Sequence, residues 1–260
     1  MFSAFLFLFG LAIGSFLNVL IDRWSQEQSI QGRSHCDYCH RQLCWYDLIP
    51  VVSFVLLGGK CRYCHKKLSW QYPLVEILTG GLFLITYYLP AGRQANHLYL
   101  WAYLGIVSCL IVIFFSDAKY HIIADQTEIG LLIFGLILLP YIGASHASPL
   151  PVVFFNRVIA AIIVMAPILF LHYVTRGKGM GFGDVKLAFV IGFLLGLQAG
   201  IIALYFAFIF GAVYGLVMLF MHRRGLKSKI AFGPFIVTGT FIMLFWGDKI
   251  LAILKQLYGF

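Results

Sequence analysis

The chain contains eight long apolar runs, and most of them approach the length that crosses a lipid bilayer. A helix needs roughly 20 apolar residues to span the hydrocarbon core. Hydrophobic residues make up 61% of the sequence and charged residues only 11%, which is not the composition of a soluble domain. We therefore predict an all-α polytopic membrane protein with about eight transmembrane helices. The predicted spans are Met1–Ile21, Leu74–Leu89, Leu98–Ser116, Glu128–Ile142, Val152–Val174, Val185–Leu197, Ala199–Met221 and Phe232–Leu251.

Two of these runs have features that qualify the prediction. In the first run, Arg23 follows the apolar residues instead of preceding them, which favours a retained anchor over a cleaved signal peptide. Gly10, Gly14 and Ser15 give this run a face of small residues that suits close helix packing. The sixth run is short and rich in glycine, and we interpret it as a broken or tilted helix.

The basic residues are concentrated in alternate loops, and this sets the predicted orientation. Segment 22–73 and loops 175–184 and 222–231 carry most of the lysines and arginines, whereas loop 90–97 has one and loop 143–151 has none. By the positive-inside rule the basic loops are cytosolic and the N-terminus lies outside. The net charge of +9 is then explained by topology and by anionic lipid headgroups, so no nucleic-acid partner is needed.

Two acidic residues are placed where a membrane protein rarely has charge. Asp117 follows the apolar run Leu104–Phe115, and Asp184 ends the turn Gly181–Asp184 between two later runs. An acid at the edge of a span usually faces a protein interior or a water-filled cavity and marks a functional site. Both acids lie on the predicted cytosolic side. Two carboxylates that meet there and share one proton would have the chemistry of an aspartic protease.

Segment 22–73 is the only long hydrophilic stretch, and its cysteines predict a zinc site. Cys36 and Cys39 form one C-x-x-C pair, Cys61 and Cys64 form another, and 21 residues separate the pairs. A segment of this size buries too little apolar surface for an independent core, so a bound metal is expected to stabilise its fold. Four thiolates make a closed tetrahedral zinc site. Disulfides or a redox site are the alternative, which a reducing cytosol disfavours.

An internal repeat supports the same prediction. Residues 36–45 align with residues 61–70 at a period of 25, with six identities in ten positions. The two cysteine pairs are therefore predicted to be one structural unit used twice. In this alignment Cys44 falls opposite Ser69, so we predict that Cys44 is not a zinc ligand. The histidine after each pair is interpreted as a neighbour of the site or a surface residue.

Several motifs of the chain, in order and over nearly its full length, resemble those of bacterial type IV prepilin peptidases, which are aspartic proteases of the G-x-G-D kind. These motifs are Gly14–Val19, Trp45–Cys64, Tyr72–Thr79, Gly181–Lys186 and Phe232–Phe235. The resemblance implies three parts: a first transmembrane helix over 1–21, a cytosolic four-cysteine zinc domain over 22–73 that is associated with methyltransferase activity, and a transmembrane peptidase domain over 74–260.

The resemblance also implies an activity and a location. Members of this family are multi-pass proteins of the bacterial inner (cytoplasmic) membrane whose active site faces the cytosol. They cut the basic leader from type IV prepilins or pseudopilins after a glycine, in pilus, secretion or competence systems. Many of them also methylate the new N-terminus, with S-adenosylmethionine as the methyl donor. The expected cofactors are thus a structural zinc and S-adenosylmethionine, and the expected partners are prepilins and membrane lipid.

The family's two catalytic aspartates correspond to Asp117 and Asp184. Around the first, Ala124 stands where the family usually has proline, and this departure loosens the turn. Asp125 is the rival for the first catalytic position, and we interpret it as the cap of the helix that starts near Thr127.

Three further residues of the motif around Asp184 are expected to support catalysis. Gly181 and Gly183 let the backbone approach the substrate and turn into the next span. Lys186 is expected to tune the aspartate pair, to bind a phospholipid headgroup or to extend to the membrane interface.

A different class of function stays open from the residues alone. The chain would then be a catalytically silent assembly or transport protein of the membrane, whose acids carry protons and whose zinc domain docks a partner. Inverted repeats of broken helices would favour transport, and the sequence shows no convincing one.

Overall fold

The computed structural model describes residues 2–88, 97–145, 148–221 and 230–258, and it divides into two compact units, residues 1–112 and 113–260. The described residues form helices and turns, with isolated bridges but no regular strand. Loop 90–97, apart from its last residue, and most of loop 222–231 lie outside the described residues. The predicted all-α fold is therefore confirmed.

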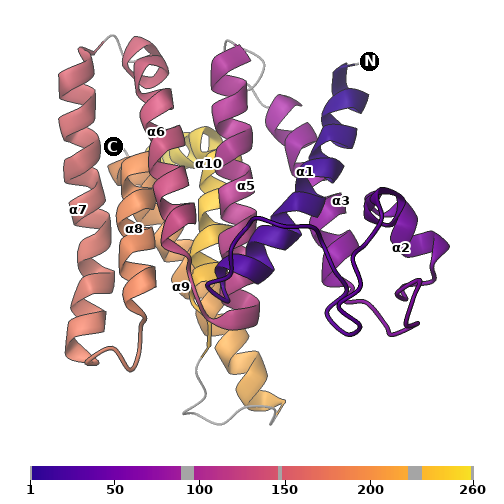
Figure 1. The fold of residues 1–260 in the computed structure, drawn as a ribbon. Coiled ribbons are helices and arrows are strands. Elements are labelled where there is room, and N and C mark those ends of the chain that lie inside the picture. Colours follow the sequence, from indigo (N-terminus) through magenta and orange to yellow (C-terminus); the bar gives the residue numbers. More distant parts are fainter. Residues whose placement is uncertain (1, 89–96, 146–147, 222–229, 259–260) are drawn as a thin grey trace. The chain divides into compact units, whose positions relative to one another are not determined.

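A helix overlaps each of the eight predicted spans (Figure 1). These helices are α1 (Phe2–Trp24), α3 (Gln71–Tyr88), α5 (His97–Tyr120), α6 (Asp125–Ser145), α7 (Leu150–Val174), α8 (Phe182–Leu195), α9 (Leu197–Phe220) and α10 (Gly233–Tyr258). Among the described residues, six helices are long and apolar enough to cross a membrane, namely α1, α5, α6, α7, α9 and α10. The multi-pass architecture is confirmed, whereas the count of eight spans is not.

In the first unit, α1 and α3 pack closely because glycines line their contact. A Cβ atom added to Gly10 would lie 2.7 Å from the Cα of Gly80, and one added to Gly14 would lie 2.6 Å from the Cα of Glu76. Real Cβ atoms do not approach that closely, so the two backbones touch where a side chain would otherwise stand. The small face predicted for the first run is therefore the face that contacts α3.

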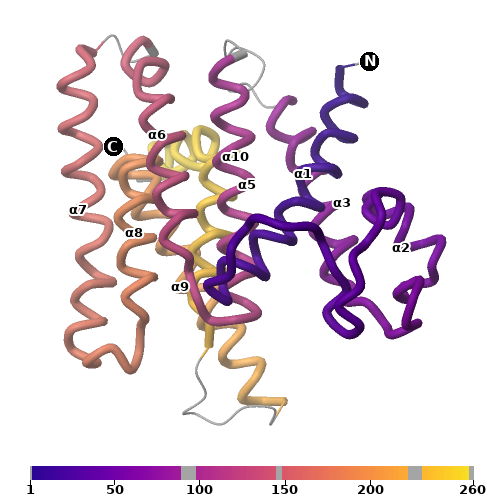
Figure 2. The backbone as a smooth tube through the Cα atoms, in the orientation of Figure 1, coloured from indigo at the N-terminus to yellow at the C-terminus, as the bar shows by residue number. Residues whose placement is uncertain are grey.

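Residues 25–70 join α1 to α3 mainly through turns, with a short 3-10 helix η1 (Trp45–Leu48) and a short helix α2 (Val52–Leu56) (Figure 2). The segment has little apolar interior, in which Phe54 packs on Trp70 with ring centroids 5.0 Å apart. Hydrogen bonds anchor it to α3. The backbone N–H of Val51 donates to Glu76 Oε2 over 2.7 Å, and the Tyr72 hydroxyl donates to Asp37 Oδ2 over 3.1 Å.

In the second unit, α8 is short and packs against α7 and α9. A Cβ at Gly192 would lie 2.7 Å from the Cα of Ala161 in α7. The helix stops at Gly196, whose φ of 83° is a left-handed conformation that favours glycine. Arg157 of α7 donates from Nη1 to the carbonyl oxygen of Leu194 over 2.9 Å and so satisfies one of the carbonyls at this helix end. The sixth run is thus a short helix, as its length indicated, but α8 is continuous over its 14 residues and the chain breaks only after it, at Gly196.

Candidate active site and metal centre

Asp117 lies inside α5, one turn before the helix ends. The apolar run stops at Phe115, but the helix continues to Tyr120, so this acid belongs to a rigid element and not to a loop. Its side chain is buried, with the residue 6% exposed. The backbone N–H of Gly233, at the start of α10, donates to Asp117 Oδ2 over 2.9 Å. Two helices therefore fix the position of one carboxyl oxygen.

Asp184 is the third residue of α8, and it is also buried, with 7% of the residue exposed. The backbone N–H of Gly181 donates to Asp184 Oδ2 over 3.1 Å, which closes the first turn of the helix. The N-terminal end of a helix carries a partial positive charge, which stabilises a carboxylate at this position. Asp184 therefore contributes to the helix start, in addition to any chemistry.

The structure brings these two predicted acids together, although 66 residues of sequence lie between them. The charge of Asp117 acts directly on the carboxyl group of Asp184. Two carboxyl groups that lie close together in a buried site resist simultaneous ionisation, and such a pair would share one proton. The hydrogen bonds from Gly233 and Gly181 occupy Oδ2 of each residue, and this arrangement suits general acid and general base catalysis.

The two glycines of the G-x-G-D turn matter for the room that their missing side chains leave, and not for an unusual backbone conformation. Gly181 has φ −69° and ψ 154°, which any residue adopts, and Gly183 is not among the glycines with positive φ. A Cβ added to Gly183 would lie 3.3 Å from the Cβ of Ile123. The missing side chain thus lets the start of α8 pack against the segment that precedes α6.

Lys186 and Asp125 form an ion pair beside this site. Lys186 Nζ lies 2.6 Å from Asp125 Oδ1, and the Asp125 side chain is 67% exposed. The interpretation of Asp125 as a helix cap is wrong, because α6 begins at Asp125 itself. The carbonyl oxygen of Ala124 instead accepts hydrogen bonds from the amide and hydroxyl of Thr127, over 3.0 and 2.6 Å. Lys186 pairs directly with Asp125, an arrangement that the sequence did not predict.

Two residues of the site were missed from the sequence. Gly233 belongs to the motif Phe232–Phe235, but it contacts Asp117 through its backbone amide. Nearly every residue type has this group, so the sequence does not indicate the contact. Glu128 lies in the first turn of α6 and is buried, with the residue 5% exposed. An acid at the start of an apolar run was the available signal for Glu128.

Replacement of Gly233 by alanine is expected to lower the rate of substrate cleavage strongly. The new Cβ would lie 2.6 Å from Asp117 Oδ2, so either the carboxylate or the start of α10 must move. Gly247→Ala in the same helix is the matched control, because its Cβ would meet Met243 Cε at an ordinary 3.5 Å. Cleavage rates of both variants check this, and equal rates would show that the Gly233 contact does not matter.

The four predicted zinc ligands come together in the first unit. The sulfur atoms of Cys36, Cys39, Cys61 and Cys64 all lie within 4.8 Å of one another, and Cys36 Sγ is 3.8 Å from Cys64 Sγ. Tetrahedral zinc with a Zn–S bond of about 2.3 Å requires sulfur atoms about 3.8 Å apart. None of the six cysteines forms a disulfide. The donor set and its spacing therefore fit a structural zinc ion.

The repeat predicted from the sequence is visible in the backbone. The amide of His40 donates to the carbonyl oxygen of Cys36 over 2.8 Å, and the amide of His65 donates to that of Cys61 over 3.0 Å. The two histidines have φ of 52° and 56° and lie exposed on the surface. The bridges His35–Gln42 and Lys60–Lys67 also correspond. The two cysteine pairs are thus one structural unit used twice, as predicted.

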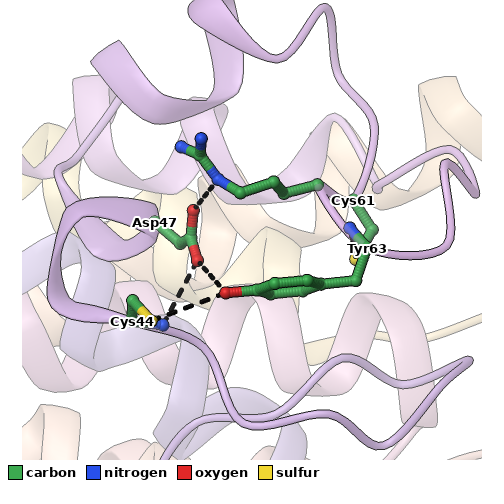
Figure 3. A network of polar contacts seen from close by, with 5 residues as sticks. Cys44, Asp47, Cys61 and Tyr63 are labelled. Atoms are coloured by element: carbon green, nitrogen blue, oxygen red, sulfur yellow. Dashed lines mark hydrogen bonds and ion pairs between the residues drawn. The ribbon is translucent and has the colours of Figure 1, made fainter.

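Cys44 lies outside the metal cluster and belongs to a polar network (Figure 3). Its Sγ is 3.5 Å from the Tyr63 hydroxyl oxygen, and a hydrogen bond from the Tyr46 hydroxyl lowers the pKa of the Cys44 thiol. The carboxylate of Asp47 accepts bonds from Arg62 Nε over 2.7 Å and from the Tyr63 hydroxyl over 3.3 Å. This network connects η1 to the second cysteine pair, and Cys44 is not among the four clustered cysteines.

Comparison with known proteins connects both sites to one family. Residues 8–89 match a family described as the bacterial peptidase A24 N-terminal domain, and residues 104–216 match the type IV leader peptidase family. No solved structure matches the chain.

Curated relatives match the chain over almost its whole length. A prepilin leader peptidase/N-methyltransferase from Bacillus subtilis is 34% identical, with 95% of this chain and 95% of the relative covered. Proteins with the same description from Pseudomonas aeruginosa and Stutzerimonas stutzeri are 29% and 28% identical, covering 97% and 95% of this chain and 93% and 91% of the relatives. The chain therefore belongs to the family of type IV prepilin leader peptidase/N-methyltransferases.

Proposed function

We propose that this protein is a membrane aspartic endopeptidase that cuts the basic leader from type IV prepilins or pseudopilins after a glycine and then methylates the new N-terminus. The observation that carries the proposal is the pair of buried aspartates, Asp117 and Asp184, each held by a backbone amide. Relatives described as prepilin leader peptidase/N-methyltransferases support the substrate and both activities.

The aspartate pair would act on a water molecule and on the scissile carbonyl. The ionised carboxyl group takes a proton from water as the water oxygen attacks the carbonyl carbon, and the protonated carboxyl group hydrogen-bonds the carbonyl oxygen. The C–N bond then breaks as the leaving nitrogen takes the proton that the first carboxyl group received from water, and that carboxyl group is ionised again. Because backbone amides occupy Oδ2 of both residues, we assign Oδ1 of each to water and substrate. The titration belongs to the pair and not to one residue.

A cleavage assay tests the proposal against the silent alternative. The purified protein is given a peptide with a basic leader, a Gly-Phe junction and an apolar helix. We expect cleavage between glycine and phenylalanine, detected by mass spectrometry. If the intact peptide persists with a protein that binds zinc and is folded, the reading as a silent assembly or transport protein is favoured. The basic leader is proposed to stay in the cytosol while the apolar helix remains in lipid.

The proposed location is the bacterial inner membrane, with the zinc domain and the aspartate pair on the cytosolic side. In whole cells, a membrane-impermeant thiol reagent is expected to label a cysteine introduced in loop 143–151 and to miss one introduced in loop 222–231. Permeabilised cells, in which both cysteines should react, are the control. The reverse labelling pattern in whole cells would place the active site outside and overturn the orientation.

Zinc held by Cys36, Cys39, Cys61 and Cys64 is proposed to have a structural role, since four thiolates leave no open position for substrate. S-adenosylmethionine would supply the methyl group. Two buried polar atoms have no hydrogen-bond partners among the described residues, namely Asn18 Oδ1 in α1 and Gln71 Nε2 at the start of α3. By their chemistry, the first would accept from the ammonium group of S-adenosylmethionine and the second would donate to its carboxylate.

We expect an Asn18→Leu variant to bind S-adenosylmethionine more weakly in calorimetry. Leucine has the same number and branching of side-chain heavy atoms as asparagine but offers the ammonium group no acceptor. A Gln26→Leu variant on the exposed surface provides the control. Unchanged affinity in Asn18→Leu would remove this residue from the donor site.

A further inference from the structure

Glu128 is a buried carboxyl group that the proposed mechanism does not use. It lies in the first turn of α6 with 5% of the residue exposed, and its Oε1 has no hydrogen-bond partner among the described residues. A buried carboxyl oxygen without a partner is costly, whether the group is ionised or protonated. Such a group is expected where a ligand completes its hydrogen bonds.

The charges around Glu128 show which kind of ligand would fit. Lys186 attracts its carboxylate, while Asp125 and Asp184 repel it. Lys186 is already bound to Asp125, with 2.6 Å between Nζ and Oδ1. One lysine therefore faces the carboxylates of Asp125 and Glu128, in addition to the negative charge of the catalytic pair. The surroundings of Glu128 therefore carry more negative than positive charge, and a cationic ligand would fit there.

The position of Glu128 relates this missing charge to the reaction. Asp125 and Glu128 are three residues apart and so lie on one face of α6. Lys186, which binds Asp125, lies two residues after Asp184 in α8. The first turns of α6 and α8 are thus neighbours, and Glu128 is close enough to Asp184 for their charges to interact. A ligand of Glu128 would be located near the start of α8, which carries Asp184.

Peptide hydrolysis creates a cation at this point. Breaking the C–N bond releases an α-amino group, whose ordinary pKa of about 7.7–8.0 leaves it mostly protonated at neutral pH. We propose that Glu128 is the binding site for this α-ammonium group, the new N-terminus of the mature pilin. The inference rests on the proposed peptidase function. An ammonium group would donate to Oε1 of Glu128 and supply the positive charge that the site lacks.

Binding of a product peptide tests the proposal without any cleavage step. The probe is a synthetic mature-pilin segment that begins with phenylalanine and contains no lysine, prepared with a free or an acetylated N-terminus. Fluorescence anisotropy measures its Kd for the full-length protein in detergent. Charge-assisted hydrogen bonds are strong, so we expect the free amine to bind about tenfold more tightly than the acetylated form. The preference should decline above pH 8 as the amine loses its proton.

Variants assign this preference to one residue. Glu128→Gln is expected to bring the ratio of the two Kd values close to one, whereas Glu128→Asp should restore part of it. Glu27→Gln, which removes an exposed acid of the first unit, is the control and should keep the wild-type ratio. Zinc content and thermal unfolding confirm that each variant is folded.

Two results would overturn the inference: no amine preference in the wild type, or a full preference in Glu128→Gln. These results differ from those that test the catalytic pair. If Asp117→Asn and Asp184→Asn still cleave substrate while the amine preference follows Glu128, the assignment of the pair fails and the binding site stands. If both aspartate variants are inactive and no preference exists, only the binding site fails.

Discussion

Replacing either Asp117 or Asp184 with asparagine is expected to reduce prepilin cleavage by roughly three orders of magnitude or more. Asparagine keeps the size of the side chain and an oxygen that can accept the bond from Gly233 or Gly181, so the helices should remain in place. The amide can neither take a proton from water nor share one with the other carboxyl group. Single-turnover cleavage of a prepilin peptide in detergent measures the loss.

The double variant gives a sharper test of the pair. Since the two carboxyl groups act as one unit, the loss in Asp117→Asn/Asp184→Asn should be close to that in either single variant, and not the product of both. Asp125→Asn is the matched control, because that side chain is 67% exposed and bound to Lys186, and it should cost far less. If Asp125→Asn abolished cleavage while Asp117→Asn were tolerated, the turn altered by Ala124 would have transferred the catalytic role to Asp125.

Loss of zinc is expected to unfold residues 22–73 while the transmembrane helices persist. The purified protein should contain one zinc ion, and Cys64→Ser should remove it. Structural zinc sites contribute about 10–16 kcal/mol to folding, which a segment with an interior as small as the Phe54–Trp70 contact cannot replace. Elemental analysis measures the metal, and limited proteolysis reports whether the segment is folded.

Cys44→Ser is the control for the metal site. This thiol lies outside the cluster, and Asp47 still bonds to Arg62 and Tyr63 when the sulfur is removed. The variant should therefore keep its zinc and its resistance to protease. Zinc retained in Cys64→Ser and lost in Cys44→Ser would show that the ligand assignment is wrong.

The sequence predicted those parts of the molecule that depend on pattern. Apolar runs predict helices because the bilayer core fixes their length, and the repeated cysteine pairs predict a metal site because two thiolates from each pair complete a tetrahedron. Gly10 and Gly14 predicted a close helix contact, and α3 provides it. The predicted orientation placed Asp117 and Asp184 on the same side of the membrane, and the family resemblance assigned them as a catalytic pair. Their spacing gave no signal, since 66 residues lie between them.

Other features depend on contacts that residue types do not encode. Hydropathy predicts where the apolar part of α5 stops but not where the helix itself stops. The helix continues past the apolar run, through Asp117 to Tyr120. The bond between Lys186 and Asp125 joins residues 61 positions apart, and it gives Asp125 a partner in place of the predicted cap. The contact of Gly233 with Asp117 uses a backbone amide, which every residue except proline has. The count of eight spans is not confirmed because α3 and α8, with 18 and 14 residues, are not among the six helices that are long and apolar enough to cross a membrane.

The duplicated cysteine unit has a consequence for how the protein is made. Each unit supplies only two thiolates, so neither can hold zinc in a closed site alone, and the metal binds firmly only after Cys64 has left the ribosome. By then α1 has been synthesised in full and is available for insertion into the membrane. The bonds that anchor the segment to α3 through Glu76 and Tyr72 form later still, because α3 follows in the chain. Biosynthesis therefore imposes an order in which the membrane anchor comes first, metal capture second and docking on α3 last.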